Sequence, residues 1–216
     1  MSHSLNEIAA HAKRAARGAG LSWGMAEEAA RATRWLAAHD LAGPALLCDV
    51  LARNDGLPHA QVAPVSLIGD WHARGGALCP LAAGATLNDC ADRLADGRPV
   101  RMLSVSCPLL VVPFVAWAAI HLKAPVRVTY DNVRIDTDGD SIRIDDPHRQ
   151  INVAKAATVT CQRTDAPIGT TQRPGLRGSV TPDIWARLDV FAQRTFAPAT
   201  EASRLLGAGA GLSDND

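Results

Sequence analysis

The sequence contains little lysine, glutamate or tyrosine, and neither sign of charge is in excess. It has three Lys, four Glu and one Tyr among 216 residues, and Lys+Arg and Asp+Glu both total 22. A chain with balanced charge has no general electrostatic attraction for nucleic acid or for an anionic membrane. We therefore expect neither nucleic acid nor a membrane among the partners of this protein.

Metal-binding and disulfide patterns are missing too. The five cysteines form no CxxC pair, and the seven histidines form no HxH or HExxH motif. Structural zinc sites and disulfide frameworks depend on spacings of this kind. We expect the cysteines to stay reduced, and we assign no metal and no cofactor.

A long apolar run is also missing. The most apolar stretch, residues 109–120, is twelve residues long and is interrupted by Pro113, whereas a membrane-spanning helix needs about twenty. The N-terminus shows no basic segment that leads into an apolar stretch, as a secretory signal would. Both features predict a cytoplasmic protein.

The first 55 residues show the pattern of helices that pack through small side chains. Ser4-x-x-Glu7 has the form of a capping box, and apolar residues follow it at helical spacing. Ser22 can cap a second helix, and Pro44 suits the first turn of a third. The 39 alanines raise the apparent helix content of the whole chain. The capping residues are therefore better evidence for helices here than the composition.

The rest of the chain alternates between strands and helices after a long connection at residues 54–83. The clearest pattern is an apolar–polar alternation on both sides of Asp138-Gly139, a pair typical of hairpin turns. Flanking strands also argue against interpreting this aspartate-rich turn as a calcium-binding loop. Strands are expected at 100–106, 126–130, 133–136, 141–145 and 157–163, and helices at 85–95 and 181–192. Residues 107–122 are expected to form a helix or an irregular apolar segment.

These elements predict an α+β fold: an N-terminal helical hairpin packed on a mixed, mostly antiparallel sheet, with a C-terminal helix. We expect one domain over residues 1–216. It would comprise a helical part at 1–55, a sheet-rich part at 98–165 and a Gly-rich tail at 205–216.

The turn after the first expected helix is a candidate anion site. Residues 17–24 lack the spacing of dinucleotide- and phosphate-binding loops, but free N–H groups at the start of the second helix can hold an anion. Lys13 and Arg17 lie one helical turn apart near this junction, and Trp23 could shield a ligand from water. The alternative interpretation is a capped helix end with two solvated cations.

Two neighbouring glutamates, Glu27 and Glu28, are candidates for a general base. Adjacent helical residues point about 100° apart, so both cannot aim at one atom. In the structural interpretation, Glu27 pairs with Arg31 one turn later, a surface contact worth about 0.3–0.5 kcal/mol. The catalytic interpretation has one of the two glutamates moving a proton beside Trp23.

Two cysteines that precede prolines are candidate nucleophiles, Cys107 at an expected strand–helix boundary and Cys79 in the long connection. Cys107 would feel a helix N-terminus, which lowers a thiol pKa, but its apolar surroundings favour an inert core residue. Cys79 lies in a loop with polar neighbours in sequence and is a candidate nucleophile, with a buried loop anchor as the alternative.

Three segments of the chain resemble an uncharacterised bacterial protein family, a domain of unknown function. The first combines residues 13–28 with Arg34-Trp35-Leu36, the second surrounds Cys79-Pro80, and the third covers residues 194–216. The resemblance carries no assigned activity. It implies that these three segments are the functional regions. The composition of the Gly-rich tail by itself predicts a flexible end, whereas the resemblance favours an ordered tail with Arg204 at its base.

We weigh two functions of different classes. In the first, the protein is a small-molecule enzyme or enzyme subunit that binds a compact anionic metabolite such as a carboxylate through Lys13, Arg17, Trp23 and Arg204. Proton transfer or nucleophilic attack would fall to Glu27, Glu28 or Cys79. In the second, a non-catalytic accessory protein engages a partner enzyme through its tail and has no deep pocket. A homodimer is compatible with both, and whether the protein catalyses a reaction stays open.

Overall fold

The computed structural model describes residues 1–165 and 174–196. Within these ranges the helices are α1 (Leu5–Gly18), α2 (Trp23–Ala38), α3 (Gly43–Asn54), α4 (His59–Val62), α5 (Pro80–Asp89), α6 (Val112–Leu122) and α7 (Pro182–Ala192), with 3-10 turns η1 (Ala91–Leu94), η2 (Pro108–Val111) and η3 (Gln193–Thr195). The strands are β1 (Ser2–Ser4), β2 (Val100–Ser106), β3 (Val126–Tyr130), β4 (Val133–Thr137), β5 (Ile142–Asp145), β6 (Lys155–Arg163) and β7 (Arg177–Ser179).

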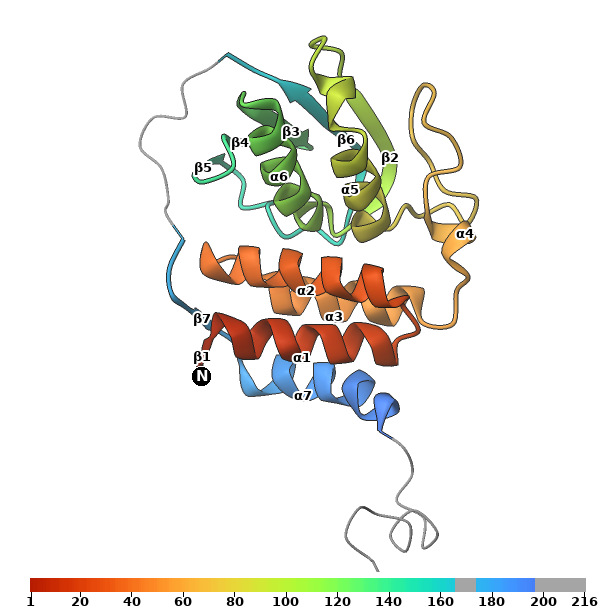
Figure 1. The fold of residues 1–216 in the computed structure, drawn as a ribbon, viewed down its shortest axis with the longest axis vertical. Helices are drawn as coiled ribbons and strands as arrows, with labels where there is room; N and C mark the ends of the chain where they lie inside the picture. The colour runs from red at the N-terminus through yellow and green to blue at the C-terminus, as the bar shows by residue number, and fades with distance from the viewer. Residues whose placement is uncertain (166–173, 197–216) are drawn as a thin grey trace, which may run out of the picture.

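The elements form a helical layer below a sheet that is covered by two helices (Figure 1). Helices α1, α2, α3 and α7 stack in the lower layer, and α5 and α6 cover one face of the sheet above them. The α+β class, the N-terminal helices and the C-terminal helix are therefore confirmed. The α1–α2 hairpin makes its main contacts toward the sheet with α5 and α6, which lie between it and the strands.

The main sheet has the strand order β2-β6-β3-β4-β5, and every neighbouring pair is antiparallel. Because β2 and β3 both run antiparallel to β6, they are parallel to one another, and α6 connects them across the inserted strand. In the described residues, parallel pairing is limited to two isolated bridges, Trp71 with Met102 and Leu78 with Val105. The connection before α5 therefore runs along the free edge of β2.

The hairpin predicted around Asp138-Gly139 is confirmed as β4 and β5, which pair from Thr137 with Ile142 outward. The Asp138 carboxylate accepts hydrogen bonds from the backbone N–H groups of Asp140 and Ser141 at 3.1 and 2.9 Å. Gly139 has φ +107°, a conformation that L side chains rarely adopt.

Across the described part of the chain, no three His, Cys, Asp or Glu side chains gather in a way that could hold a metal ion.

The predicted caps of the first two helices are present. Ser4 N–H donates to the Glu7 carboxylate at 2.7 Å while Glu7 N–H donates to Ser4 Oγ at 3.2 Å, which completes a capping box. Ser22 Oγ accepts from Met25 N–H at 3.3 Å. The facing sides of α1 and α2 carry fully buried alanines that let the two helices approach closely: Ala12, Ala15, Ala16, Ala26 and Ala29.

Helix α5 and the strands β1 and β7 differ from the sequence prediction. Helix α5 begins at Pro80, whereas we expected residues up to 83 to belong to the connection, because Pro80 occupies the first helical turn instead of breaking a helix. Strands β1 and β7 were not predicted, since their partners, such as Ser4 and Arg177, lie far apart in sequence. This small sheet closes the side of the helical layer next to α1.

One buried apolar cluster runs through both layers, from Ala12 to Ala192. It includes residues of α1, α2, α3, α5, α6, α7 and the main sheet.

None of the described helices is both long and apolar enough to cross a membrane.

Candidate functional site

A cavity of about 350 Å³ opens at one end of the helical layer, where the α1–α2 turn meets α3, α4 and the start of α5. Its volume falls in the range of about 300–1,000 Å³ that small-molecule sites occupy. Apolar side chains make most of the wall. The described residues that line the cavity are Ala19, Gly20, Leu21, Ser22, Met25, Val50, Leu51, Asn54, Leu57, His59, Val62, Cys79, Leu81 and Ala82.

The first wall is the tight turn between α1 and α2. Gly20 has φ +92°, which ends α1 and redirects the chain, and Ser22 caps α2 two residues later. Leu21 N–H donates to Ala16 O at 3.1 Å and holds the turn against the helix end. The turn that we considered for an anion thus contributes Ala19, Gly20, Leu21 and Ser22 to the cavity wall.

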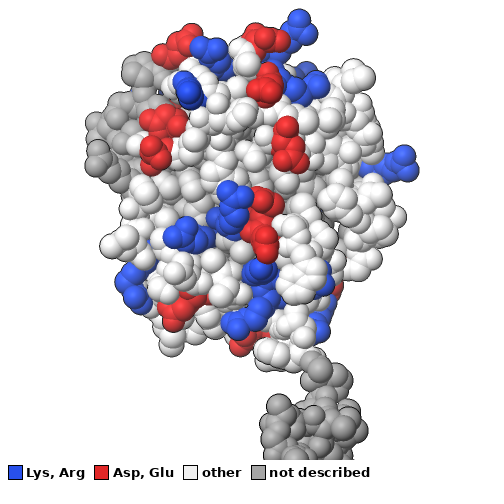
Figure 2. All heavy atoms as spheres, viewed as in Figure 1, with Lys and Arg blue, Asp and Glu red and all other residues white. Residues whose placement is uncertain are grey.

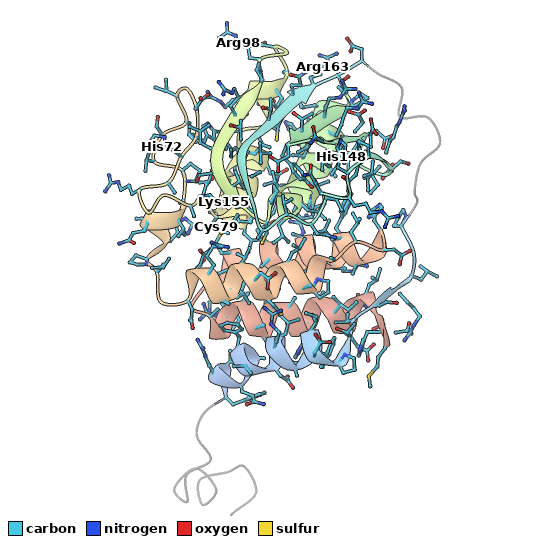
Figure 3. The ribbon with its side chains drawn as sticks, turned by 180° about the vertical axis from the view of Figure 1, so that it is seen from behind. His72, Cys79, Arg98, His148, Lys155 and Arg163 are labelled. Carbon is cyan, nitrogen blue, oxygen red and sulfur yellow. The ribbon has the colours of Figure 1, made fainter. Side chains whose placement is uncertain are left out.

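The opposite wall is the start of α5, where Cys79 is the N-cap and Pro80 follows it. Leu78 is bound to the edge of β2, and Cys79 N–H donates to Val62 O at 2.9 Å. Figure 3 labels Cys79 at the level where the sheet layer meets the helical layer. The wall is therefore anchored on two sides by backbone hydrogen bonds.

The Cys79 side chain is buried, since only 6% of the residue is exposed. Burial raises the pKa of Cys79, although the N–H groups of Ala82 and Leu81 and the side chain of Asn54 act in the opposite direction. The thiol consequently stays protonated at neutral pH. This arrangement makes it a hydrogen-bonding group at the cavity wall and a poor nucleophile in the free protein.

The residues predicted for the anion site form a surface cluster outside the described cavity wall. Lys13 Nζ lies 2.7 Å from the Glu27 carboxylate, and this hydrogen bond and charge lower the pKa of Glu27. The Arg17 guanidinium lies 4.4 Å from the Trp23 ring centre and donates to Leu21 O. The structure therefore brings Lys13, Arg17, Trp23 and Glu27 together across the α1–α2 hairpin, with the Lys13 charge already paired.

Glu28 points to a different side of α2 from Glu27. Its carboxylate binds Arg31 at 3.0 Å, and the Arg31 guanidinium lies 4.2 Å from the ring centre of Trp117 on α6. The predicted pair between Glu27 and Arg31 is wrong, because Lys13 competes from the facing helix. Glu28 Oε2 is buried without a hydrogen-bond partner among the described residues, but neither glutamate lines the cavity.

Cys107 is a core residue, as the structural interpretation expected. It is 1% exposed, it adopts φ +43° between β2 and η2, and burial raises its pKa to about 11. The expected effect of a helix N-terminus on this thiol is thus outweighed by desolvation. Arg204 and the Gly-rich tail at 205–216 lie outside the described residues.

Sequence reasoning missed the α3–α4 corner, which supplies Asn54, Leu57 and His59 to the cavity. These three residues carry no motif. The available signal was the unusual length of the connection at 54–83, which is uncommon unless a loop has a function. Leu57 is 46% exposed and His59 is also exposed, so both lie toward the mouth.

A second cleft of about 480 Å³ lies between α2, α6, the β4–β5 turn and residues 174–176. Arg31 and Arg34 line it beside Trp35 and Trp117, but Asp140 lines it as well, and Arg31 already pairs with Glu28. Figure 2 shows positive and negative side chains mixed on this face of the molecule. The first cavity is therefore the better candidate for a ligand site.

Residues 3–79 match the model of a family described as proteins of unknown function (DUF3726). The match contains the first resemblance segment and ends at Cys79, so the resemblance to an uncharacterised family is confirmed over this part of the chain. No curated protein matches the chain. The matched part provides three walls of the cavity, whereas Leu81 and Ala82 lie just beyond it.

Proposed function

We propose that this protein binds a compact carboxylic acid in the cavity between the α1–α2 turn, α3, α4 and α5, as a small-molecule enzyme or enzyme subunit. The observation that carries the proposal is the cavity itself: a mainly apolar space with four polar side chains, Ser22, Asn54, His59 and Cys79. Such a wall suits a ligand with an apolar body and one polar head.

The apolar body would pack against leucine, valine and methionine side chains of three helices. Leu51 and Val62 are buried, and Met25 is half-buried, so a ligand would extend an existing core contact. Removing apolar surface from water contributes about 25 cal/mol for each Å². This term would supply most of the binding free energy.

The carboxylate head would lie at the start of α5. No Lys, Arg, Asp or Glu occurs among the described lining residues, so hydrogen bonds and the helix N-terminus would have to hold the charge. The N-terminus of a helix favours an anion by about 0.3–1 kcal/mol, and up to about 2 kcal/mol where it is partly buried. Asn54 and the Cys79 thiol offer additional donors at this wall.

Cys79 is the one proposed catalytic residue that also lines the cavity, and its protonated thiol supports a role in orienting the head group. His59, near the mouth, is a candidate for moving a proton to or from a bound ligand. The rival hypothesis of an accessory protein predicted no deep pocket, so the cavity favours ligand binding.

The test is a thermal-shift and calorimetric screen of the full chain against four- to eight-carbon carboxylates and the matching alcohols. A ligand at 100 times its dissociation constant adds about 2.7 kcal/mol to the stability. We expect stabilisation by at least one carboxylate and weaker stabilisation by its alcohol.

Ala82→Phe, which fills the cavity, should abolish this effect, and Leu57→Arg at the exposed mouth should weaken it. The matched control is Ala52→Phe on the exposed side of α3, which should bind like the natural chain. A screen without any binder, or equal binding by Ala82→Phe and Ala52→Phe, contradicts the proposal.

A further inference from the structure

The second cleft, between α2, α6 and the β4–β5 turn, carries opposite charges on different walls. Arg34 lines it from α2 and Asp140 lines it from the turn, and both residues are exposed. Within residues 1–165 and 174–196, neither of them takes part in an ion pair. The mixed charges that disfavour a simple anion here suit a ligand that itself carries both signs.

The other titratable groups of the cleft leave these two charges available. The Arg31 guanidinium lies 3.0 Å from the Glu28 carboxylate and 4.2 Å from the ring centre of Trp117, so its charge is already balanced. Burial lowers the pKa of His39, which therefore stays neutral at pH 7. Among the described lining residues, one cation on α2 and one anion on the turn remain for a ligand.

Two indole rings provide apolar surface in the same cleft. Trp35 and Trp117 both line it, are half-buried and pack against the main core cluster. Trp117 meets Phe114 edge-on with ring centres 5.0 Å apart, and the Trp35 ring lies 4.0 Å from the His39 ring. Because these contacts already hold the rings, a ligand that packs on them costs little conformational entropy. Ile120, which is 52% exposed, adds an aliphatic contact on α6.

The turn that carries Asp140 is fixed against α6. Thr137 Oγ1 accepts a hydrogen bond from Gly139 N–H at 3.0 Å and donates one to Ser141 O at 2.9 Å. A Cβ added to Gly139 would clash with the Ile120 side chain, so the turn backbone packs directly on the helix. Asp140 thus has a defined place on the cleft wall, and no described contact of the fold uses its carboxylate.

We propose that this cleft binds a free α-amino acid with a large apolar side chain. The Arg34 guanidinium pairs with the ligand's carboxylate, the Asp140 carboxylate pairs with its ammonium group, and its side chain packs on the two indole rings. The cleft volume of about 480 Å³ lies in the range of small-molecule sites. The described walls of this cleft and of the first cavity share no residue, so the inference does not rest on the proposed function.

Each part of such a ligand meets a group that suits its chemistry. A guanidinium can donate two parallel hydrogen bonds to a carboxylate, which fixes the orientation of the ligand as well as its charge. An ammonium group is attracted to a carboxylate and also to the face of an indole ring. A ligand that lacks either charge leaves one wall of the cleft without a partner, so the cleft should select a zwitterion over a simple acid or amine.

Calorimetric titration of the full chain with L-phenylalanine, L-tryptophan and L-leucine tests the proposal. We expect at least one of them to bind at millimolar concentration or below. For L-phenylalanine, the analogues that lack one charge are 3-phenylpropionate and 2-phenylethylamine. Each should bind about tenfold more weakly than the amino acid, the equivalent of 1.4 kcal/mol.

Charge-neutral variants of the two walls identify the site. Arg34→Gln and Asp140→Asn should each lower the affinity for the amino acid about tenfold. The matched controls are Arg14→Gln on the exposed side of α1 and Asp131→Asn in the exposed β3–β4 turn, which should bind like the natural chain. In Arg34→Gln, L-phenylalanine and 2-phenylethylamine should bind equally, because the partner of the carboxylate is gone. In Asp140→Asn, L-phenylalanine and 3-phenylpropionate should bind equally.

The indole N–H signals in nuclear magnetic resonance spectra report where the amino acid binds. The signals of Trp35 and Trp117 should shift on titration, and that of Trp71, which is 1% exposed, should not. Equal affinity of the wall variants and their controls overturns the proposal, and so does the absence of binding by all three amino acids. Ala82→Phe fills the first cavity and should leave amino-acid binding unchanged. If it abolishes binding while Arg34→Gln does not, the ligand lies in the first cavity and the proposal is wrong.

Discussion

At the scale of single residues, burial sets the state of the titratable groups. Desolvation raises the pKa of Cys161 to about 12 and that of Cys48 to about 11, and it also raises the pKa of Cys79. All three are therefore thiols at neutral pH. Cys79 differs from Cys48 and Cys161 because it lines a cavity.

His39 predicts how stability depends on pH. Its Nδ1 lies 2.8 Å from Trp35 O, and burial lowers its pKa below the ordinary value. Between the folded pKa and the unfolded value of about 6.5, the unfolded chain binds more protons than the folded chain. Stability should therefore fall as the pH is lowered from about 6.5 through the folded pKa.

Urea denaturation at pH 7.5 and 5.5 measures this effect. His39→Gln should reduce the loss of stability on acidification, whereas His72→Gln, at an exposed position, should leave it unchanged. An identical pH dependence in the natural chain and in His39→Gln would contradict the assignment.

At the scale of elements, close backbone contacts decide how the helices pack. Gly18 at the end of α1 touches the backbone of α7, whereas a Cβ added to Gly24 in the first turn of α2 would have no atom within 4 Å. Gly84 on α5 similarly faces the Phe114 ring on α6, with 2.3 Å between its added Cβ and the nearest ring atom. Gly18 and Gly84 thus mark where the layers need the closest approach.

The pair Gly18→Ala and Gly24→Ala tests this argument. Gly18→Ala should destabilise the chain by about 2–3 kcal/mol, because the new methyl group must displace a backbone carbonyl. Gly24→Ala should stabilise it by about 0.4–1 kcal/mol through a lower entropy of the unfolded chain. Chemical denaturation measures both changes, and a Gly18→Ala variant as stable as the natural chain would show that α7 is not seated on α1 as described.

At the scale of the whole molecule, the segment that matches the family model depends on the rest of the chain. Helix α1 packs on α7, α2 packs on α5 and α6, and the connection before α5 is paired with β2. Trp71, which is 1% exposed, donates its backbone N–H to Arg101 O at 2.8 Å. Residues 3–79 therefore leave several buried faces open when they stand alone.

We expect a fragment of residues 1–79 not to fold cooperatively. It lacks α7, α5, α6 and β2, so the apolar faces of α1 and α2 would be exposed to water. Circular dichroism should show reduced helix content and a broad thermal transition, and the full chain should unfold in a sharp one. A sharp, reversible transition of the fragment would instead show that the matched segment is an independent unit.

Much of the fold follows from interactions between residues close in sequence. The Ser4–Glu7 capping box, the Asp138-Gly139 hairpin and the helical spacing of the N-terminal part depend on groups within a few positions of one another. Such contacts form in nearly the same way wherever the segment lies, so a sequence pattern reveals them. The α+β class could be inferred for this reason.

The candidate site was accessible to sequence analysis only in part. The turn at Gly20 and the block at Cys79 were both singled out, and they lie at one cavity. Two contacts required the packing of separate helices: Lys13 of α1 pairs with Glu27 of α2, and the Asn54 side chain of α3 interacts with Cys79 at the start of α5. No spacing in the sequence encodes which distant surfaces meet, because many pairings of apolar faces satisfy the same local pattern.

The amino-acid sequence thus determines the secondary structure of this chain locally. Caps, turn residues and amphipathic spacing specify where helices and strands begin and end. The tertiary structure alone decided that the α1–α2 turn, α3, α4 and the start of α5 enclose a cavity. The physical reason is that local elements are selected by contacts over a few residues, whereas a cavity arises from the small mismatch left when large surfaces pack.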